Sequence, residues 1–289
     1  MPSEPYAVIS VSYNSAREMT PFLRSFQDST QPPAAIIVVD NASSDAELTR
    51  EIVESHGGRF LALAENRGYG GGANAALPLI PAGIRRIVVA NPDVIVSPSA
   101  AEELGAVLDA QPSAGAVGPC IFGDDGERYP SARALPTLGM GIGHALFANI
   151  WPNNPWSRRY REPGSLAVPH RVGWLSGAFL FLRKDAFTAI RGFDEGYFMY
   201  FEDVDLGLRL ERAGWGSWFA PDASVVHHGA RSTSRDPQRM RAAHHRSAYR
   251  YLSRIYDKPL QAPLRLLLRL GLSIRGRMSA SPAPAAPGE

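Results

Sequence analysis

Several residue types that define common protein classes are scarce in this sequence. The 289 residues contain a single cysteine, Cys120, so no disulfide can form within the chain. The N-terminus lacks a basic segment followed by a long apolar one, which predicts that there is no signal peptide. The longest apolar stretch, around residues 175–182, is too short to cross a bilayer. These absences favour a cytoplasmic protein without a membrane-spanning helix.

Lysine is also scarce, since only Lys184 and Lys258 occur and the remaining basic residues are arginines. The formal net charge is only +2, but the charge is unevenly distributed. Residues 231–277 contain twelve Arg or Lys against two Asp, about +10, which leaves about −8 for the rest of the chain. A basic segment attached to an acidic body predicts an anionic partner for that segment.

The first 95 residues alternate between short apolar segments and helical ones. The expected strands are residues 6–12, 35–40, 59–64 and 86–90, and the expected helices are residues 16–29, 45–55 and 67–79. This alternation predicts an α/β fold with a mostly parallel sheet flanked by helices.

Polar residues follow each of these strands directly. They are Tyr13, Asn14, Asp40, Asn66, Asn91 and Asp93. In an open α/β sheet the ligand crevice lies at the carboxyl ends of the strands, so we expect a ligand site there.

The second half of the chain is less regular. Residues 121–131 look irregular, and the expected elements are strands at 174–182 and 224–226 and a helix at 201–213. Residues 236–278 predict a basic helical extension. The Ser/Ala/Pro-rich segment 279–289 is expected to be disordered.

Three groups of residues could carry chemistry. Asp93 follows a buried strand in a turn stiffened by Pro92, which suits either a divalent metal or an ordinary turn. Glu202, Asp203 and Asp205 begin a helix beside an aromatic segment, where a carboxylate can act as a general base or simply complement the helix dipole. His227 ends a strand and can be a metal ligand or a plain surface residue.

Seven motifs resemble, in order, those of family-2 glycosyltransferases, above all the rhamnosyltransferases that modify polyprenyl-diphosphate-linked N-acetylglucosamine. The motifs are VSYNS (11–15), VVDNASSD (38–45), ENRGYGGGAN (65–74), NPDV (91–94), WLSGAFLFLRKDAF (174–187), GFDEGYFMYFEDVDLGLR (192–209) and VVHHG (225–229). The resemblance covers roughly residues 6–235. It implies a GT-A nucleotide-sugar-binding domain over 1–235, with a donor half of about 1–95 and an acceptor half of about 96–235.

The resemblance also implies roles for individual residues. Asp203 would be the base of an inverting transfer, with Glu202 beside it, and Mg²⁺ or Mn²⁺ would be bound by Asp93 and His227. Asn91 stands where the family's Asp-x-Asp motif has its first Asp. The nucleotide-sugar donor, with dTDP-rhamnose favoured, would contact Tyr13, Asn14, Asp40, Asn66, Arg67, Asn91 and Asp93. The lipid-linked acceptor would contact Trp174, Ser176, Gly177 and Asp205.

Two other functions are weaker interpretations of the same sequence. Residues 68–73 fit the G-x-G-x-x-A pattern of nucleotide-dependent oxidoreductases, but that pattern belongs in the first strand–helix turn, which here is residues 12–15. A non-catalytic protein with a decayed transferase fold would not need Asp93, Asp203 and His227.

The C-terminal extension has the pattern of an interfacial helix. Leu264, Leu267, Leu268 and Ile274 form an apolar stripe within residues 263–277. Arginines flank this stripe or precede it on the expected helix; they are Arg239, Arg246, Arg250, Arg254, Arg265 and Arg269. The pattern predicts an anionic membrane surface as partner, not a nucleic acid, and a peripheral location on the inner face of the cell membrane. The alternative is a helix that packs its leucines on the catalytic domain. The sequence does not specify the oligomeric state.

Overall fold

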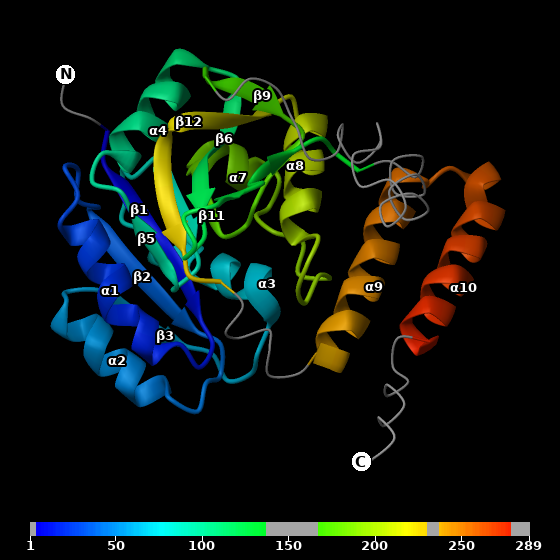
Figure 1. The fold of residues 1–289 in the computed structure, drawn as a ribbon, viewed down its shortest axis with the longest axis horizontal. Coiled ribbons are helices and arrows are strands. Elements are labelled where there is room, and N and C mark those ends of the chain that lie inside the picture. The colour runs from blue at the N-terminus through cyan, green and yellow to red at the C-terminus, as the bar shows by residue number, and fades with distance from the viewer. Residues whose placement is uncertain (1–3, 137–166, 230–236, 279–289) are drawn as a thin grey trace, which may run out of the picture.

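The computed structural model describes residues 4–136, 167–229 and 237–278. A twisted sheet with helices on both faces forms the body, and two C-terminal helices lie along one side of it (Figure 1). The strands of the main sheet follow the order β3 (Arg59–Ala62), β2 (Ala35–Asp40), β1 (Tyr6–Ser12), β4 (Arg86–Ala90), β11 (Phe179–Arg183), β6 (Ala114–Phe122), β12 (Gly216–His227) and β5 (Val94–Val96). Off this path, β7 (Arg128–Tyr129) pairs with β6 and β9 (His170–Val172) pairs with β12. A separate pair consists of β8 (Ala132–Arg133) and β10 (Trp174–Leu175).

The first four strands are parallel, as the sequence predicts. β1 is central, pairing in parallel with β2 on one side and with β4 on the other. Its side chains are buried on both faces: Tyr6 and Val8 enter one core, and Ala7 and Ile9 enter the other. The carboxyl ends of these strands therefore meet at one edge, where the expected ligand residues are.

Each face of the sheet is covered by helices. One core includes residues of α1 (Ala16–Gln27), α2 (Ala46–Ser55) and α4 (Ala100–Ala110). The opposite core includes residues of α3 (Gly68–Ala75), α7 (Lys184–Ala189) and α8 (Glu202–Arg212). The predicted α/β architecture, with a sheet flanked by helices, is confirmed.

Some predicted boundaries were wrong for local physical reasons. The helix expected to reach residue 79 ends at Ala75 and continues as a short 3-10 turn that contains Pro78, which has no amide hydrogen to donate. The strand expected at 174–182 is two strands separated by a turn at Ser176–Ala178. The strand expected at 224–226 is the end of β12, which is interrupted by a register shift around Pro221. Residues 121–129 are not irregular, because β6 and β7 form a hairpin.

The C-terminal extension is helical, as predicted, and its first helix packs on the body. Tyr251 of α9 (Pro237–Ile255) is fully buried in a third core with Trp174, Tyr197, Val204 and Leu208. The second helix, α10 (Ala262–Met278), packs against α9 and lies farther from the sheet (Figure 1). The described helices include none that combines the length and apolarity needed to cross a bilayer. The predicted disordered tail, 279–289, lies outside the described residues.

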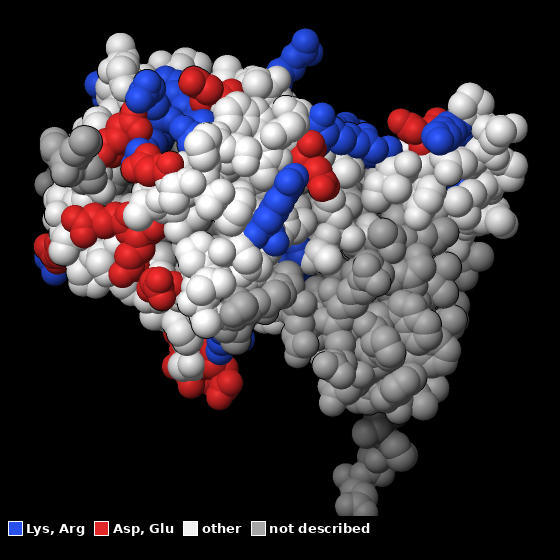
Figure 2. All heavy atoms as spheres, turned by 90° about the horizontal axis from the view of Figure 1, so that it is seen from above, with Lys and Arg blue, Asp and Glu red and all other residues white. Residues whose placement is uncertain are grey.

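Acidic side chains gather on the end of the body opposite α10 (Figure 2). This acidic end agrees with the excess of negative charge expected for the body from the sequence.

The contact between α8 and β10 gives a test of the fold. A Cβ at Gly207 would lie 2.6 Å from the Gly173 carbonyl oxygen and 2.8 Å from the Cβ of Trp174. Gly207→Ala should therefore lower the free energy of unfolding by about 1–3 kcal/mol, although alanine is the better helix former. In a chain of this size the melting temperature should fall by roughly 2–4 °C per kcal/mol. The control is Gly271→Ala in α10, where nothing lies within 4 Å of the added methyl. An unchanged melting temperature for Gly207→Ala would contradict the close packing.

Candidate active site

Two loops on the donor side are joined by Asn41, a residue for which the sequence analysis assigned no role. Its side-chain amide donates to the Gly68 carbonyl (2.9 Å), and its oxygen accepts from the Arg67 amide (2.9 Å). Asn66 accepts from the Gly68 amide (2.9 Å), so it stabilises the start of α3. The sequence could have indicated a role for Asn41 in the site only through its position, directly after Asp40 at the end of a strand.

Asp40 is fully buried at the end of β2. One of its carboxylate oxygens accepts from the Ser43 amide (2.9 Å), and the other has no hydrogen-bond partner among the described residues. A buried acceptor without a donor costs free energy, so this oxygen is suited to a ligand donor such as a base N–H.

Tyr13 and Asn14 follow β1 at the same edge. Tyr13 is 42% exposed, as a residue that stacks on a ligand would be. Asn14 adopts a positive φ of 54°, and its side-chain oxygen accepts from the amide (2.9 Å) and the hydroxyl (2.8 Å) of Ser44. The Asn14 side-chain oxygen therefore stabilises the contact between these two loops, and the contact of Asn14 with the donor stays a prediction.

Arg67, expected to contact the donor, forms an ion pair with Glu195 (2.7 Å). Glu195 also accepts from the side chain of Asn74 (3.1 Å). Burial alone would raise the pKa of Glu195, but the hydrogen bonds from Arg67 and Asn74 outweigh it and lower that pKa. The charged Glu195 carboxylate thus orients the Arg67 guanidinium beside the start of α3.

Asn91, Asp93 and His227 converge where β4 and β12 end. The Nε2 atom of His227 lies 3.1 Å from an Asp93 carboxylate oxygen and 3.2 Å from the side-chain nitrogen of Asn91. That Asp93 oxygen is buried and accepts no hydrogen bond of good geometry. Two ligands of one octahedral ion, each about 2.1 Å from it, lie about 3 Å apart. One carboxylate oxygen and one imidazole nitrogen at this separation therefore fit a divalent cation.

The described residues include no group of three or more His, Cys, Asp or Glu side chains arranged to bind a metal. Asp93 and His227 would therefore supply two protein ligands, leaving other positions to water and substrate phosphate. Mg²⁺ commonly binds in this way, through one or two carboxylates together with substrate phosphates.

Glu202, which is buried, and Asp203, which is half-buried, form a carboxyl pair at the start of α8. Burial, followed by the neighbouring charge of Asp203, raises the pKa of Glu202 to about 8. Burial also raises the pKa of Asp203, but this carboxylate accepts from the amides of Gly177 (3.0 Å) and Val204 (2.8 Å), which oppose the rise. Amide donors favour the charged form. The amide donors therefore favour the negative charge on Asp203, whereas Oε2 of Glu202 has no hydrogen-bond partner among the described residues.

Tyr69, which the sequence analysis did not assign, connects the two halves of the site. Its hydroxyl donates to the Gly177 carbonyl (2.6 Å), and the amide of the same Gly177 donates to Asp203. The pKa of Tyr69 is raised well above its usual value by burial and then by the charges of Glu202, Asp203 and Asp93. The candidate metal ligand and the carboxyl pair thus lie around one phenol. Only the position of Tyr69 between two glycines of a motif could have indicated this role.

The backbone leading to the carboxyl pair is strained. Tyr200 and Phe201 both have a φ of 66°, in the left-handed region that residues with a Cβ rarely adopt. Each such residue costs about 1–3 kcal/mol and persists only when the surrounding structure holds it. The strain turns the chain sharply into α8, so that Glu202 and Asp203 lie in its first turn.

The four expected acceptor residues occupy different environments. Ser176 is half-buried, and Gly177 lies against the Asp203 side chain. Trp174 is only 6% exposed, and its ring nitrogen donates to the Ala134 carbonyl (3.0 Å), so it packs β10 against α8.

Asp205 is fully buried between Arg209 (2.6 Å) and Arg254 (3.1 Å). Trp174 and Asp205 are therefore buried and engaged within the fold, and their contact with the acceptor stays a prediction.

Residues 2–249 match the protein family described as Glycosyltransferase like family 2. The chain is 39% identical over 280 residues to the N-acetylglucosaminyl-diphospho-decaprenol L-rhamnosyltransferase of Mycobacterium tuberculosis, covering 94% of this chain and 91% of that protein. It is 27% identical over 226 residues to rhamnosyltransferase WbbL of Escherichia coli, covering 76% and 82% of the two chains.

Solved structures share the fold. S. aureus TarS (residues 1–349) has a TM-score of 0.58 at 16% identity, covering 96% of this chain and 72% of that one. The mannosyltransferase PcManGT from Pyrobaculum calidifontis, solved with GDP-Man and Mn²⁺, has a TM-score of 0.61 at 17% identity, covering 98% and 78%. The expected GT-A fold is confirmed, and neither the oxidoreductase nor the non-catalytic alternative gains support. This chain is therefore a glycosyltransferase that belongs to glycosyltransferase family 2.

Proposed function

We propose that the enzyme transfers rhamnose, with inversion, from dTDP-rhamnose to a hydroxyl of polyprenyl-diphosphate-linked N-acetylglucosamine, in the assembly of a cell wall or surface polysaccharide. The 39% identity to the mycobacterial rhamnosyltransferase, over nearly the full length of both chains, supports rhamnose as the transferred sugar and this class of acceptor. The observation that carries the catalytic part is the Glu202–Asp203 pair, in which Glu202 is buried and two amide donors favour charge on the half-buried Asp203.

The roles of the residues follow from this proton distribution. Asp203 accepts the proton of the acceptor hydroxyl as that oxygen attacks the anomeric carbon. Glu202 remains protonated, so it adds no second negative charge beside the base. A single displacement from the face opposite the nucleotide inverts the anomeric configuration.

The donor would be bound at the carboxyl ends of β1, β2 and β4. The free oxygen of Asp40 would accept from the nucleotide base, Tyr13 would stack on it, and Arg67 would approach the diphosphate. Asp93 and His227 would bind Mg²⁺ or Mn²⁺, with Asn91 beside them. A metal bound there would supply positive charge to neutralise the charge developing on the leaving nucleoside diphosphate.

The acceptor chemistry favours a membrane-surface location, because a polyprenyl diphosphate projects from the bilayer. Leu266, Leu267 and Leu270 of α10 are each more than half exposed, and Leu260 before it is 95% exposed. These four leucines form the proposed membrane face, which differs from the stripe expected from sequence: Leu264 and Leu268 are half-buried, and the side chain of Ile274 lies outside the described residues. Arg265 donates to the carbonyls of Tyr256 and Lys258, which leaves Arg269 to meet anionic headgroups.

Asp203→Asn should lower kcat by a factor of about 10² or more, since general-base catalysis contributes about 10²–10⁴-fold. TDP binding should be largely retained. The matched variant is Glu202→Gln, which resembles the protonated acid in shape and charge and should retain far more activity. Steady-state kinetics with the lipid-linked acceptor measure both variants. Near-normal turnover by Asp203→Asn, or equal losses in both, would contradict the assignment of the base.

The nucleotide and metal assignments are tested together by thermal stabilisation. With Mn²⁺ present, TDP and UDP should raise the melting temperature more than ADP or GDP. Chelation should reduce that stabilisation and abolish transfer. Asp93→Asn should likewise reduce the rise in melting temperature that TDP causes. Asp109→Asn is the control, because Asp109 pairs with Arg86 away from this edge. Full activity after exhaustive chelation would exclude the metal role, and preference for ADP or GDP would exclude the proposed donor.

Vesicle binding tests the membrane face. Leu267→Glu with Leu270→Glu should reduce co-sedimentation with anionic vesicles several-fold, while folding is kept because both side chains are exposed. Leu48→Glu is the control, since Leu48 is 52% exposed on α2, at the opposite end of the molecule (Figure 1). Unchanged binding by the α10 variant would reject this face. An oligomer that dissociates in the same variant would indicate a second copy as the occupant.

A further inference from the structure

We infer that helix α9 is part of the catalytic apparatus, in which Arg250 and Arg254 act as positioning residues for the segment that presents the base. The sequence analysis assigned these arginines only to the basic surface of the C-terminal extension. The inference rests on the proposal that Asp203 is the base, and it concerns residues 194–203, called here the base-presenting segment.

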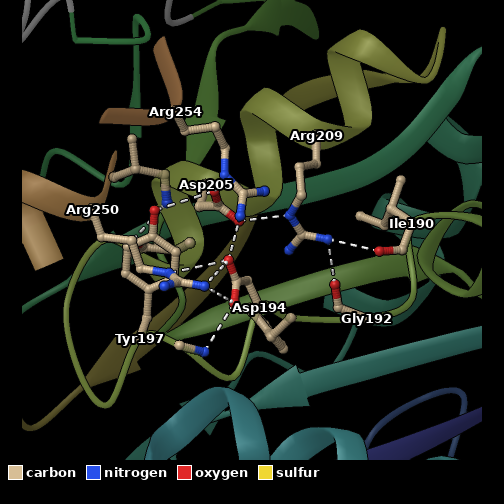
Figure 3. Close-up of polar contacts among 12 residues, drawn as sticks. Ile190, Gly192, Asp194, Tyr197, Asp205, Arg209, Arg250 and Arg254 are labelled. Atoms are coloured by element: carbon tan, nitrogen blue, oxygen red, sulfur yellow. Dashed lines mark hydrogen bonds and ion pairs between the residues drawn. The ribbon is translucent and has the colours of Figure 1, made fainter. Parts of the chain in front are cut away.

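Asp194, at the start of this segment, is bound by both arginines (Figure 3). Arg250 donates to both of its carboxylate oxygens, at 2.8 and 2.9 Å, and Arg254 donates to one of them. Asp194 in turn accepts from the Gly196 amide (2.9 Å), which closes a tight turn. Burial disfavours charge on Asp194, but the hydrogen bonds from Arg250 and Gly196 and the charges of Arg250 and Arg254 together outweigh it and lower the pKa of that carboxyl. The ion pairs therefore persist throughout the neutral range.

The second attachment is at α8 itself. Arg254 also reaches Asp205, whose other oxygen is bound by Arg209 (Figure 3). Arg209 donates to the carbonyls of Ile190 (2.8 Å) and Gly192 (2.7 Å), just before the base-presenting segment. Arg254 therefore contacts both a residue that opens this segment and a residue two positions after Asp203.

Close packing accompanies the charges. A Cβ on Gly196 would lie 2.1 Å from the central carbon of the Arg250 guanidinium, so the arginine lies directly on bare backbone. The same guanidinium lies 5.3 Å from the centre of the Tyr197 ring. Such a contact requires a specific position of Arg250, whereas a solvated surface arginine would need none.

The strained residues of the segment also contact α9. Ser247 donates to the carbonyl of Met199 (2.8 Å), immediately before Tyr200 and Phe201. The ring of His244 contacts both of these aromatic rings, and Tyr251 contacts Phe201. Left-handed backbone at two consecutive residues persists only when the surrounding structure holds it. The contacts from α9 hold the chain at this point, directly before Glu202 and Asp203.

The test compares full-length variants for turnover and nucleotide binding. Arg250→Gln with Arg254→Gln should lower kcat by about tenfold to a hundredfold, the scale expected when a catalytic group is displaced by about 1 Å. The dissociation constant for TDP should change little, and kcat is expressed per TDP-binding site so that unfolded protein does not contribute. Arg246→Gln is the matched control, because Arg246 is an exposed arginine of α9 that forms no ion pair with a described residue.

Conservative replacement separates positioning from folding. Arg250→Lys should recover part of the kcat lost in Arg250→Gln, because it restores a charge beside Asp194. Should the double variant fail to bind TDP, Arg250→Gln alone provides the comparison, since that side chain is 44% exposed. An unchanged kcat per TDP site in the arginine variants, with Asp203→Asn inactive, would overturn this inference and leave the proposed base intact. An active Asp203→Asn would instead overturn the base itself.

Discussion

The proposed mechanism depends on a single negative charge shared unequally between two neighbouring carboxyl groups, the buried Glu202 and the half-buried Asp203. Burial disfavours charge on both Glu202 and Asp203, and their proximity makes a double charge worse still. The amides of Gly177 and Val204 resolve the competition in favour of Asp203. Gly177 is in turn fixed by the hydroxyl of Tyr69 in α3. The donor half and the acceptor half are therefore joined at the atom proposed to accept the proton.

The donor half could be predicted well from sequence because its signals are local. Buried parallel strands are short apolar runs, and the polar residues at their ends necessarily meet at one edge. β12 was recognised only at its end, because Pro221 interrupts the ladder and hides a strand that runs from Gly216 to His227. The Ser176–Ala178 turn could not be predicted either, since its surroundings read as one continuous apolar strand.

The site was harder to predict because acidic residues that are close in sequence occupy different environments in the fold. Asp203 and Asp205 are two residues apart in a helix, so their side chains diverge by about 200° around its axis. Asp203 lies beside Gly177, whereas Asp205 is enclosed by arginines. The spacing of four residues between Asp205 and Arg209 indicated an ion pair along the helix. No pattern in the sequence could show that Arg254 returns from the far C-terminal region to the same carboxylate, because that contact exists only in the folded chain.

The central claim is a single displacement at the anomeric carbon, with Asp203 as the base. The most direct test is to incubate the purified enzyme with dTDP-rhamnose and polyprenyl-diphosphate-linked N-acetylglucosamine, and to determine the anomeric configuration of the product by NMR. The account predicts a rhamnosylated product whose anomeric configuration is opposite to that of the donor. A product with the donor's configuration would contradict it, because retention requires a different arrangement of catalytic groups.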